Sequence, residues 1–148
     1  MRAAAFAASI FVLLVGSAQA DVVTEWNSIW LDCVRATGGP PCPVSRAGAM
    51  VHVAIFDAVN AIDPAYEPYL FRRRARGFAS REAAVAAAAH DVLVHLYPQR
   101  RAQLDAALHA ALGCRSGARG LAAGVSLGRS VAQPVINARR KHGSRDTT

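Results

Sequence analysis

The sequence has no long hydrophobic run beyond its first 20 residues. A membrane-spanning helix needs about 20 consecutive apolar residues, and the best later stretch, Ala83 to Leu96, is interrupted by two histidines and an aspartate. The sequence also has no convincing run of alternating apolar and polar residues between turn residues, the pattern typical of a half-buried strand. These absences argue against a membrane span and against a β-sheet.

Lysine is nearly absent, since all but one of the 17 basic residues are arginine, in a chain of net charge +7. The one dense basic run is Arg72-Arg73-Arg74 followed by Arg76. Such a run could contact phosphate groups or an anionic membrane surface. No aromatic residues alternate with these arginines, so bases would have nothing to stack on. We interpret the run as a solvated loop between helices and expect no nucleic-acid partner.

Cysteine is scarce, with only Cys33, Cys42 and Cys114 in the chain. An odd number leaves at least one cysteine without an intramolecular partner. A Cys33–Cys42 disulfide would close a loop of about ten residues and stabilise the fold by about 3 kcal/mol in the chain-entropy model. The sequence leaves open whether this disulfide forms; if it does, Cys114 is the free thiol.

The first 20 residues have the layout of a secretory signal peptide. Arg2 gives a positive start, residues 3–15 are apolar, and Ala18-Gln19-Ala20 is a small-residue cleavage site. Cleavage before Asp21 would leave one domain able to bury about two-thirds of its unfolded surface. We therefore expect an exported protein, periplasmic or secreted.

The rest of the chain has helical periodicity. Apolar residues recur at spacings of three and four, and glycines and prolines separate the periodic segments. The expected fold is all-α, a bundle of about five helices within residues 21–140, followed by a short polar tail at 141–148. The helices are expected at about 22–37, 43–62, 81–96, 99–112 and 118–140.

Local signals add detail to these helices. Asp21 and Ser80 are expected as helix N-caps. In the last helix, Gly120, Gly124 and Gly128 share one face, which lets another helix approach its backbone closely. The same helix contains Pro134, which is expected to kink it.

Two short patterns match site motifs but lack the context that those motifs need. Gly124-x-Ser126-x-Gly128 matches the nucleophile elbow of serine hydrolases, which requires a preceding strand, whereas here the pattern lies inside a predicted helix. Asp91 and His95 are one helical turn apart, but no companion pair of ligands completes a metal site. We therefore assign no catalytic, cofactor-binding or metal-binding residue.

The helix predicted over 43–62 is apolar except for a few side chains, among which His52, Asp57 and Asn60 are the most unusual. A buried polar group without a partner costs about 1–3 kcal/mol. On a helical wheel the three fall within about 140° of arc. We interpret them as a structural polar cluster, a buried hydrogen-bond network that fixes how the helices pack. The alternative is a cluster that supports a catalytic site.

The same region resembles a known family. The strongest likeness is carried by MVHVAIFDAVNAI at 50–62 and YEPY at 66–69. These residues resemble the N-terminal region of bacterial vanadium-dependent haloperoxidase-like proteins, which share a superfamily with the type 2 phosphatidic acid phosphatases. ASREAA at 79–84 and LVHLYP at 93–98 are also similar, so the likeness covers about 22–140.

The resemblance implies an α-helical fold and, in complete members, a vanadate or phosphate site made by a lysine, two arginines, backbone amides and a histidine. The family's motifs for this site are K-x6-R-P, P-S-G-H and S-R-x5-H. This sequence has no Arg-Pro and no Ser-Gly-His, and its one lysine is Lys141, close to the end. Ser45-Arg46-x5-His52 fits the third motif, but by accident, because it lies in the N-terminal part of the resemblance.

These departures predict the N-terminal scaffold region of a haloperoxidase-like protein whose catalytic half is absent. Alone, such a chain would hold no vanadate and have no peroxidase or phosphatase activity. The expected partner is the missing half or a second copy, bound through exposed apolar faces. Two alternatives remain open: a stand-alone periplasmic helical binding module, and a subunit completed by a separate chain that carries the motifs.

Overall fold

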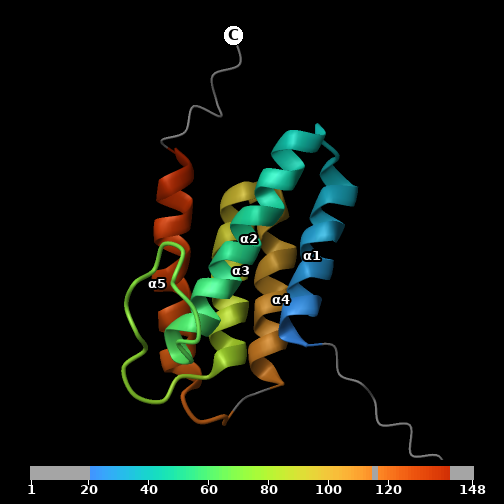
Figure 1. The fold of residues 1–148 in the computed structure, drawn as a ribbon. Helices are drawn as coiled ribbons and strands as arrows, with labels where there is room; N and C mark the ends of the chain where they lie inside the picture. The colour runs from blue at the N-terminus through green and yellow to red at the C-terminus, as the bar shows by residue number, and fades with distance from the viewer. Residues whose placement is uncertain (1–20, 115–116, 141–148) are drawn as a thin grey trace, which may run out of the picture.

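The computed structural model describes residues 21–114 and 117–140, which form five α-helices and no strand (Figure 1). The predicted all-α bundle is therefore confirmed. The predicted signal peptide and polar tail lie outside the described residues. The helices are α1 Val22–Thr37, α2 Pro41–Ile62, α3 Arg81–Leu96, α4 Arg101–Gly113 and α5 Leu121–Arg140, with a 3-10 turn, η1 Pro98–Arg100, before α4.

Helix boundaries follow local chemistry. The Ser80 hydroxyl accepts a hydrogen bond of 3.2 Å from the Ala83 amide, as predicted for the cap of α3. Asp21 is the N-cap residue of α1, but its side chain makes no capping bond. Helix α2 begins two residues earlier than predicted, since Pro41 suits the first turn of a helix. Helix α5 begins later than predicted, after Gly120, whose φ of 78° is left-handed.

The centre of the bundle is the alanine-rich helix α3, which contacts all four other helices. Figure 1 shows it behind α2, with α5 on one side and α4 and α1 on the other. Residues 83–90 of α3 are buried without interruption. Small side chains all round a helix allow neighbours to approach on every side, so α3 acts as the core helix.

Helices α3 and α5 make the most extensive contact of the bundle. A methyl group added at Gly124 would collide with the Ser80 carbonyl oxygen, and one added at Gly128 with that of Ala84. The close approach expected from the glycine spacing is therefore present. Helix α5 continues through Pro134.

Helix α2 is long and apolar enough, by length and composition, to cross a membrane. Its buried residues, among them Val51, Ala54, Ile55 and Ala58, instead belong to the core cluster of the bundle. A core helix of this kind meets the same criteria as a membrane span, so α2 by itself does not indicate a membrane protein.

Candidate functional site

The most elaborate polar arrangement lies where α2 holds the loop that leads to α3. Asp57 of α2 is fully buried. Its carboxylate accepts hydrogen bonds from the backbone amides of Tyr69 at 2.8 Å, Leu70 at 2.8 Å and Phe71 at 2.9 Å. Three donors compensate the buried charge, which otherwise would be costly to remove from water.

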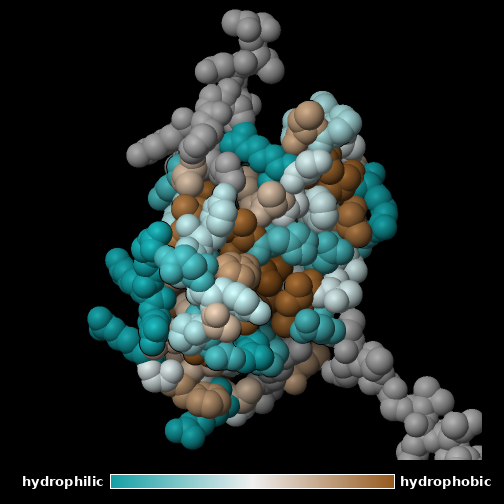
Figure 2. All heavy atoms as spheres, in the orientation of Figure 1, coloured by the Kyte–Doolittle hydropathy of each residue, from teal (hydrophilic) through white to brown (hydrophobic). Residues whose placement is uncertain are grey.

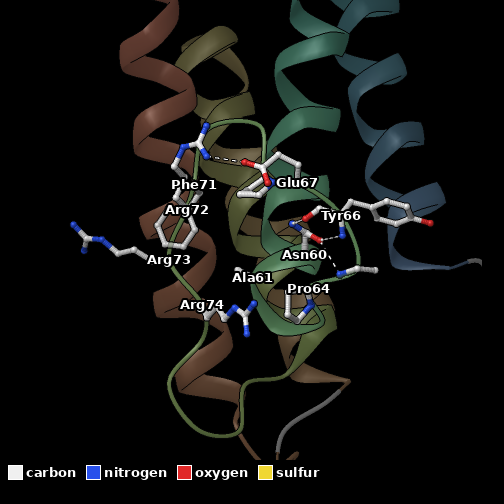
Figure 3. A pocket seen from close by; sticks show the side chains of 11 residues that line it. Asn60, Ala61, Pro64, Tyr66, Glu67, Phe71, Arg72, Arg73 and Arg74 are labelled. Atoms are coloured by element: carbon white, nitrogen blue, oxygen red, sulfur yellow. Dashed lines mark hydrogen bonds and ion pairs between the residues drawn. The ribbon is translucent and has the colours of Figure 1, made fainter.

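Asn60, one helical turn further along, holds the start of the same loop (Figure 3). Its side-chain oxygen accepts from the amides of Ala65 at 3.1 Å and Tyr66 at 2.9 Å, and its nitrogen donates to the Tyr66 carbonyl at 2.8 Å. At these positions the loop backbone therefore takes hydrogen-bond partners from the side chains of Asp57 and Asn60 instead of from a neighbouring helix or strand backbone. We call these two residues and their six bonds the loop clasp.

His52 does not join the loop clasp. It is exposed, its Nε2 lies 3.0 Å from the Asn27 side-chain oxygen of α1, and its ring meets the Trp30 ring edge-on at 6.2 Å between centroids. The prediction of one buried three-residue network is therefore corrected in two respects. Asp57 and Asn60 tie a loop to a helix, and His52 makes a separate surface contact with α1.

A second buried polar group is His90 of α3, which sequence reasoning missed. Its Nδ1 lies 2.9 Å from the Asp91 carboxylate and its Nε2 lies 2.8 Å from the Asp105 carboxylate of α4. An ionised carboxylate only accepts hydrogen bonds, so both ring nitrogens can donate at the same time only when His90 is protonated to the imidazolium. The Trp26 ring of α1 lies nearly perpendicular to the His90 ring, 6.4 Å between centroids.

The two carboxylates change the titration of His90. Burial lowers its pKa, but the hydrogen bonds to Asp91 and Asp105 and their charges outweigh burial, so the pKa is raised above the ordinary value of 6.5. Asp91, which lies one helical turn from His95 in the sequence, contacts its chain neighbour His90 in the structure. Among the described residues, no group of three or more His, Cys, Asp or Glu side chains is placed to hold a metal ion.

The raised pKa makes the stability of the bundle dependent on pH. Protonated His90 should add its full contribution to the free energy of unfolding below about pH 6.5, the pKa of an unfolded histidine. This contribution should be lost as pH rises through the higher folded-state pKa. Urea unfolding between pH 5.5 and 9 should show this loss in the wild type and less of it in Asp105→Asn. The exposed His109→Gln variant should follow the wild type; equal slopes in all three proteins would refute the assignment.

The G-x-S-x-G match and the S-R-x5-H match found in the sequence have no site geometry around them. Ser126 lies within α5 between two glycines that pack on α3, with no strand before it among the described residues. Ser45, Arg46 and His52 all lie inside the single helix α2, and the His52 ring is bonded to Asn27. Neither match forms an exposed turn or an oxyanion loop.

The three cysteines are free thiols in the structure, and no Cys33–Cys42 bridge is formed. Cys33 is buried on α1, whereas Cys42 and Cys114 are exposed. Burial raises the pKa of the Cys33 thiol, although the nearby Arg100 guanidinium lowers it in part. A protonated, buried thiol is a poor nucleophile, so Cys33 serves as a small core residue.

The loop held by the clasp also presents the arginine run. Figure 3 shows the Arg72 guanidinium directed at Glu67, with which it forms an ion pair of 2.7 Å. Arg73 extends outward from the loop, and Arg74 points toward Pro64. A hollow of about 490 Å³ lies inside the bend of the loop, between this ion pair and Asn60. The prediction of an exposed basic loop between helices is therefore confirmed.

No family model, curated protein or solved structure matches the chain.

Proposed function

We propose that this chain is a helical scaffold region of an exported vanadium-dependent haloperoxidase-like protein, and that by itself it has no peroxidase or phosphatase activity. The observation that carries the proposal is the loop clasp. The two sequence blocks with the strongest likeness to that family, 50–62 and 66–69, are the helix and the loop that Asp57 and Asn60 join. Holding the loop backbone accounts for an aspartate at position 57 and an asparagine at position 60, so no catalytic role is needed to explain them.

The inactivity follows from the geometry around the Ser45-Arg46-x5-His52 match, which supplies no clamp for catalysis. Binding a highly charged tetrahedral anion for catalysis needs several preorganised donors around one position. His52, the histidine of the S-R-x5-H match, is bonded to Asn27 on the outside of the bundle. Arg46 precedes it in the same helix rather than facing it from another element.

In this proposal, the partner covers apolar side chains that the bundle leaves at its surface. Phe56, Tyr66, Tyr69 and Phe78 are all more than one-third exposed. Figure 2 shows apolar residues emerging between polar ones over α1 and α2. Exposed apolar groups of this kind favour burial against another surface, which we assign to the region carrying the oxyanion motifs or to a second copy.

These exposed aromatic side chains also favour a second candidate, a stand-alone helical binding module. The Phe56 ring on α2 and the Tyr66 ring on the loop pack in a tilted arrangement, 6.2 Å between centroids. Aromatic side chains are typical anchors of protein interfaces. This candidate needs no region with oxyanion motifs.

The proposal is tested by bromide-dependent peroxide turnover in the presence of orthovanadate. We expect the rate of the wild type and of His52→Ala to equal the protein-free blank. Any wild-type rate above the blank would overturn the proposal, and its loss in His52→Ala would assign that activity to His52.

A second measurement separates the two candidates. If a coding sequence next to this one carries K-x6-R-P, P-S-G-H and S-R-x5-H, its product should bind the chain and supply the turnover that the chain lacks. If no neighbouring coding sequence carries these motifs, or if its product does not bind, the stand-alone module is favoured.

A further inference from the structure

The arginine run has a fixed backbone, unlike a freely solvated basic loop. Phe71 at its start is buried and its amide is bonded to Asp57. In the middle, the Ala75 amide donates to the Ala61 carbonyl at 2.7 Å, and at the end the Ser80 amide donates to the Gly120 carbonyl at 3.0 Å. The backbone that carries these arginines is therefore held in place before any ligand arrives.

The charge of this segment is largely uncompensated. Of its four arginines, Arg72 is paired with Glu67. Arg73, Arg74 and Arg76 make no ion pair within the part of the chain that the structure describes. Like charges on a fixed backbone repel one another, and an anion placed between them would relieve this repulsion.

A second hollow, of about 610 Å³, lies between this segment and α5. Arg73, Arg74 and Arg76 line one side of it, and Ser126 and Ser130 of α5 line the other. Both serines are exposed. The described residues that line it include no acidic side chain, whereas Glu67 lines the neighbouring hollow drawn in Figure 3.

We propose that the hollow between the arginine run and α5 binds the phosphate group of a small anionic ligand. A guanidinium is a planar fork that can donate two hydrogen bonds to the oxygens of a phosphate. On the opposite wall the Ser126 hydroxyl adds a neutral donor, whereas the Ser130 hydroxyl donates to the Ser126 carbonyl at 2.9 Å. The volume is within the range of small-molecule sites. The inference does not rest on the proposed function, because it uses neither the family resemblance nor the S-R-x5-H match.

Titration with phenyl phosphate tests the inference, followed by NMR of the arginine Nε–Hε groups and by calorimetry at low salt. We expect saturable binding by the wild type and an increase in Kd of about tenfold or more in Arg73→Gln/Arg74→Gln, which loses two charged donors. The matched control is Arg35→Gln/Arg101→Gln, which removes the same charge from exposed positions on α1 and α4. The control should bind as the wild type does.

A parallel titration with phosphatidylcholine vesicles, with and without phosphatidylglycerol, identifies the source of the phosphate. Binding of phenyl phosphate indicates a soluble ligand. Binding only to the phosphatidylglycerol vesicles, lost in Arg73→Gln/Arg74→Gln, indicates a lipid headgroup. If neither probe binds, or if the control pair loses binding as much as Arg73→Gln/Arg74→Gln does, the proposal is wrong.

Discussion

Replacing Asp57 with alanine is expected to lower the free energy of unfolding by about 3–5 kcal/mol, because three amide groups lose their shared acceptor. These amides belong to Tyr69, Leu70 and Phe71, and the carboxylate that bonds them is fully buried. Urea denaturation measures the change.

The loop should also become open to proteolysis. The arginines at 72–76 are trypsin sites, and cleavage there needs local release of the backbone. We expect slow cleavage in the wild type and fast cleavage in Asp57→Ala. The control is Glu67→Gln, which removes an exposed ion pair on the same loop and should change stability by at most about 1 kcal/mol. Equal cleavage rates in the wild type and Asp57→Ala would contradict the role of the clasp.

The second large effect is expected at the contact of α3 with α5. Gly128→Ala should lower the free energy of unfolding by about 1–3 kcal/mol, since the new methyl group meets the Ala84 carbonyl and the helices must move apart. In the middle of a helix, glycine-to-alanine substitution is ordinarily stabilising by about 0.5–1 kcal/mol. A decrease in the free energy of unfolding would therefore indicate the close contact between α3 and α5, because an uncrowded site would show an increase.

The matched control for Gly128→Ala is Gly113→Ala, in the last turn of α4. A methyl group there meets nothing within 4 Å, so this substitution should be neutral or slightly stabilising. Thermal or urea unfolding of both variants measures the difference. If Gly128→Ala were as stable as Gly113→Ala, the backbones of α3 and α5 would not be in close contact.

The features that the sequence predicted are those that depend on local chemistry. Helical periodicity, the Ser80 cap and the four-residue spacing of Gly124 and Gly128 each involve residues within one or two turns. The start of α5 was predicted too early because Gly120 takes a left-handed conformation, which a sequence pattern does not specify.

The features that were missed depend on partners distant in the sequence. His90 bonds Asp105, 15 residues away on another helix, and no local pattern identifies that pairing. One signal was available: His90 is four residues after Ala86, on the buried stripe of its helix. The helical wheel placed His52 with Asp57 and Asn60, but an arc of about 140° spans two faces, one toward α1 and one toward the loop.

The alanine core of α3 has a consequence for how this bundle can vary over evolutionary time. Where two helices meet through backbone atoms and methyl groups, there is no spare volume to absorb a single enlarging substitution. A larger side chain at Ala84 or Ala87 would be accepted only with a compensating reduction opposite, and Gly128 is already the smallest residue there is. Descendants of this sequence should therefore keep these positions small together or exchange them as a set.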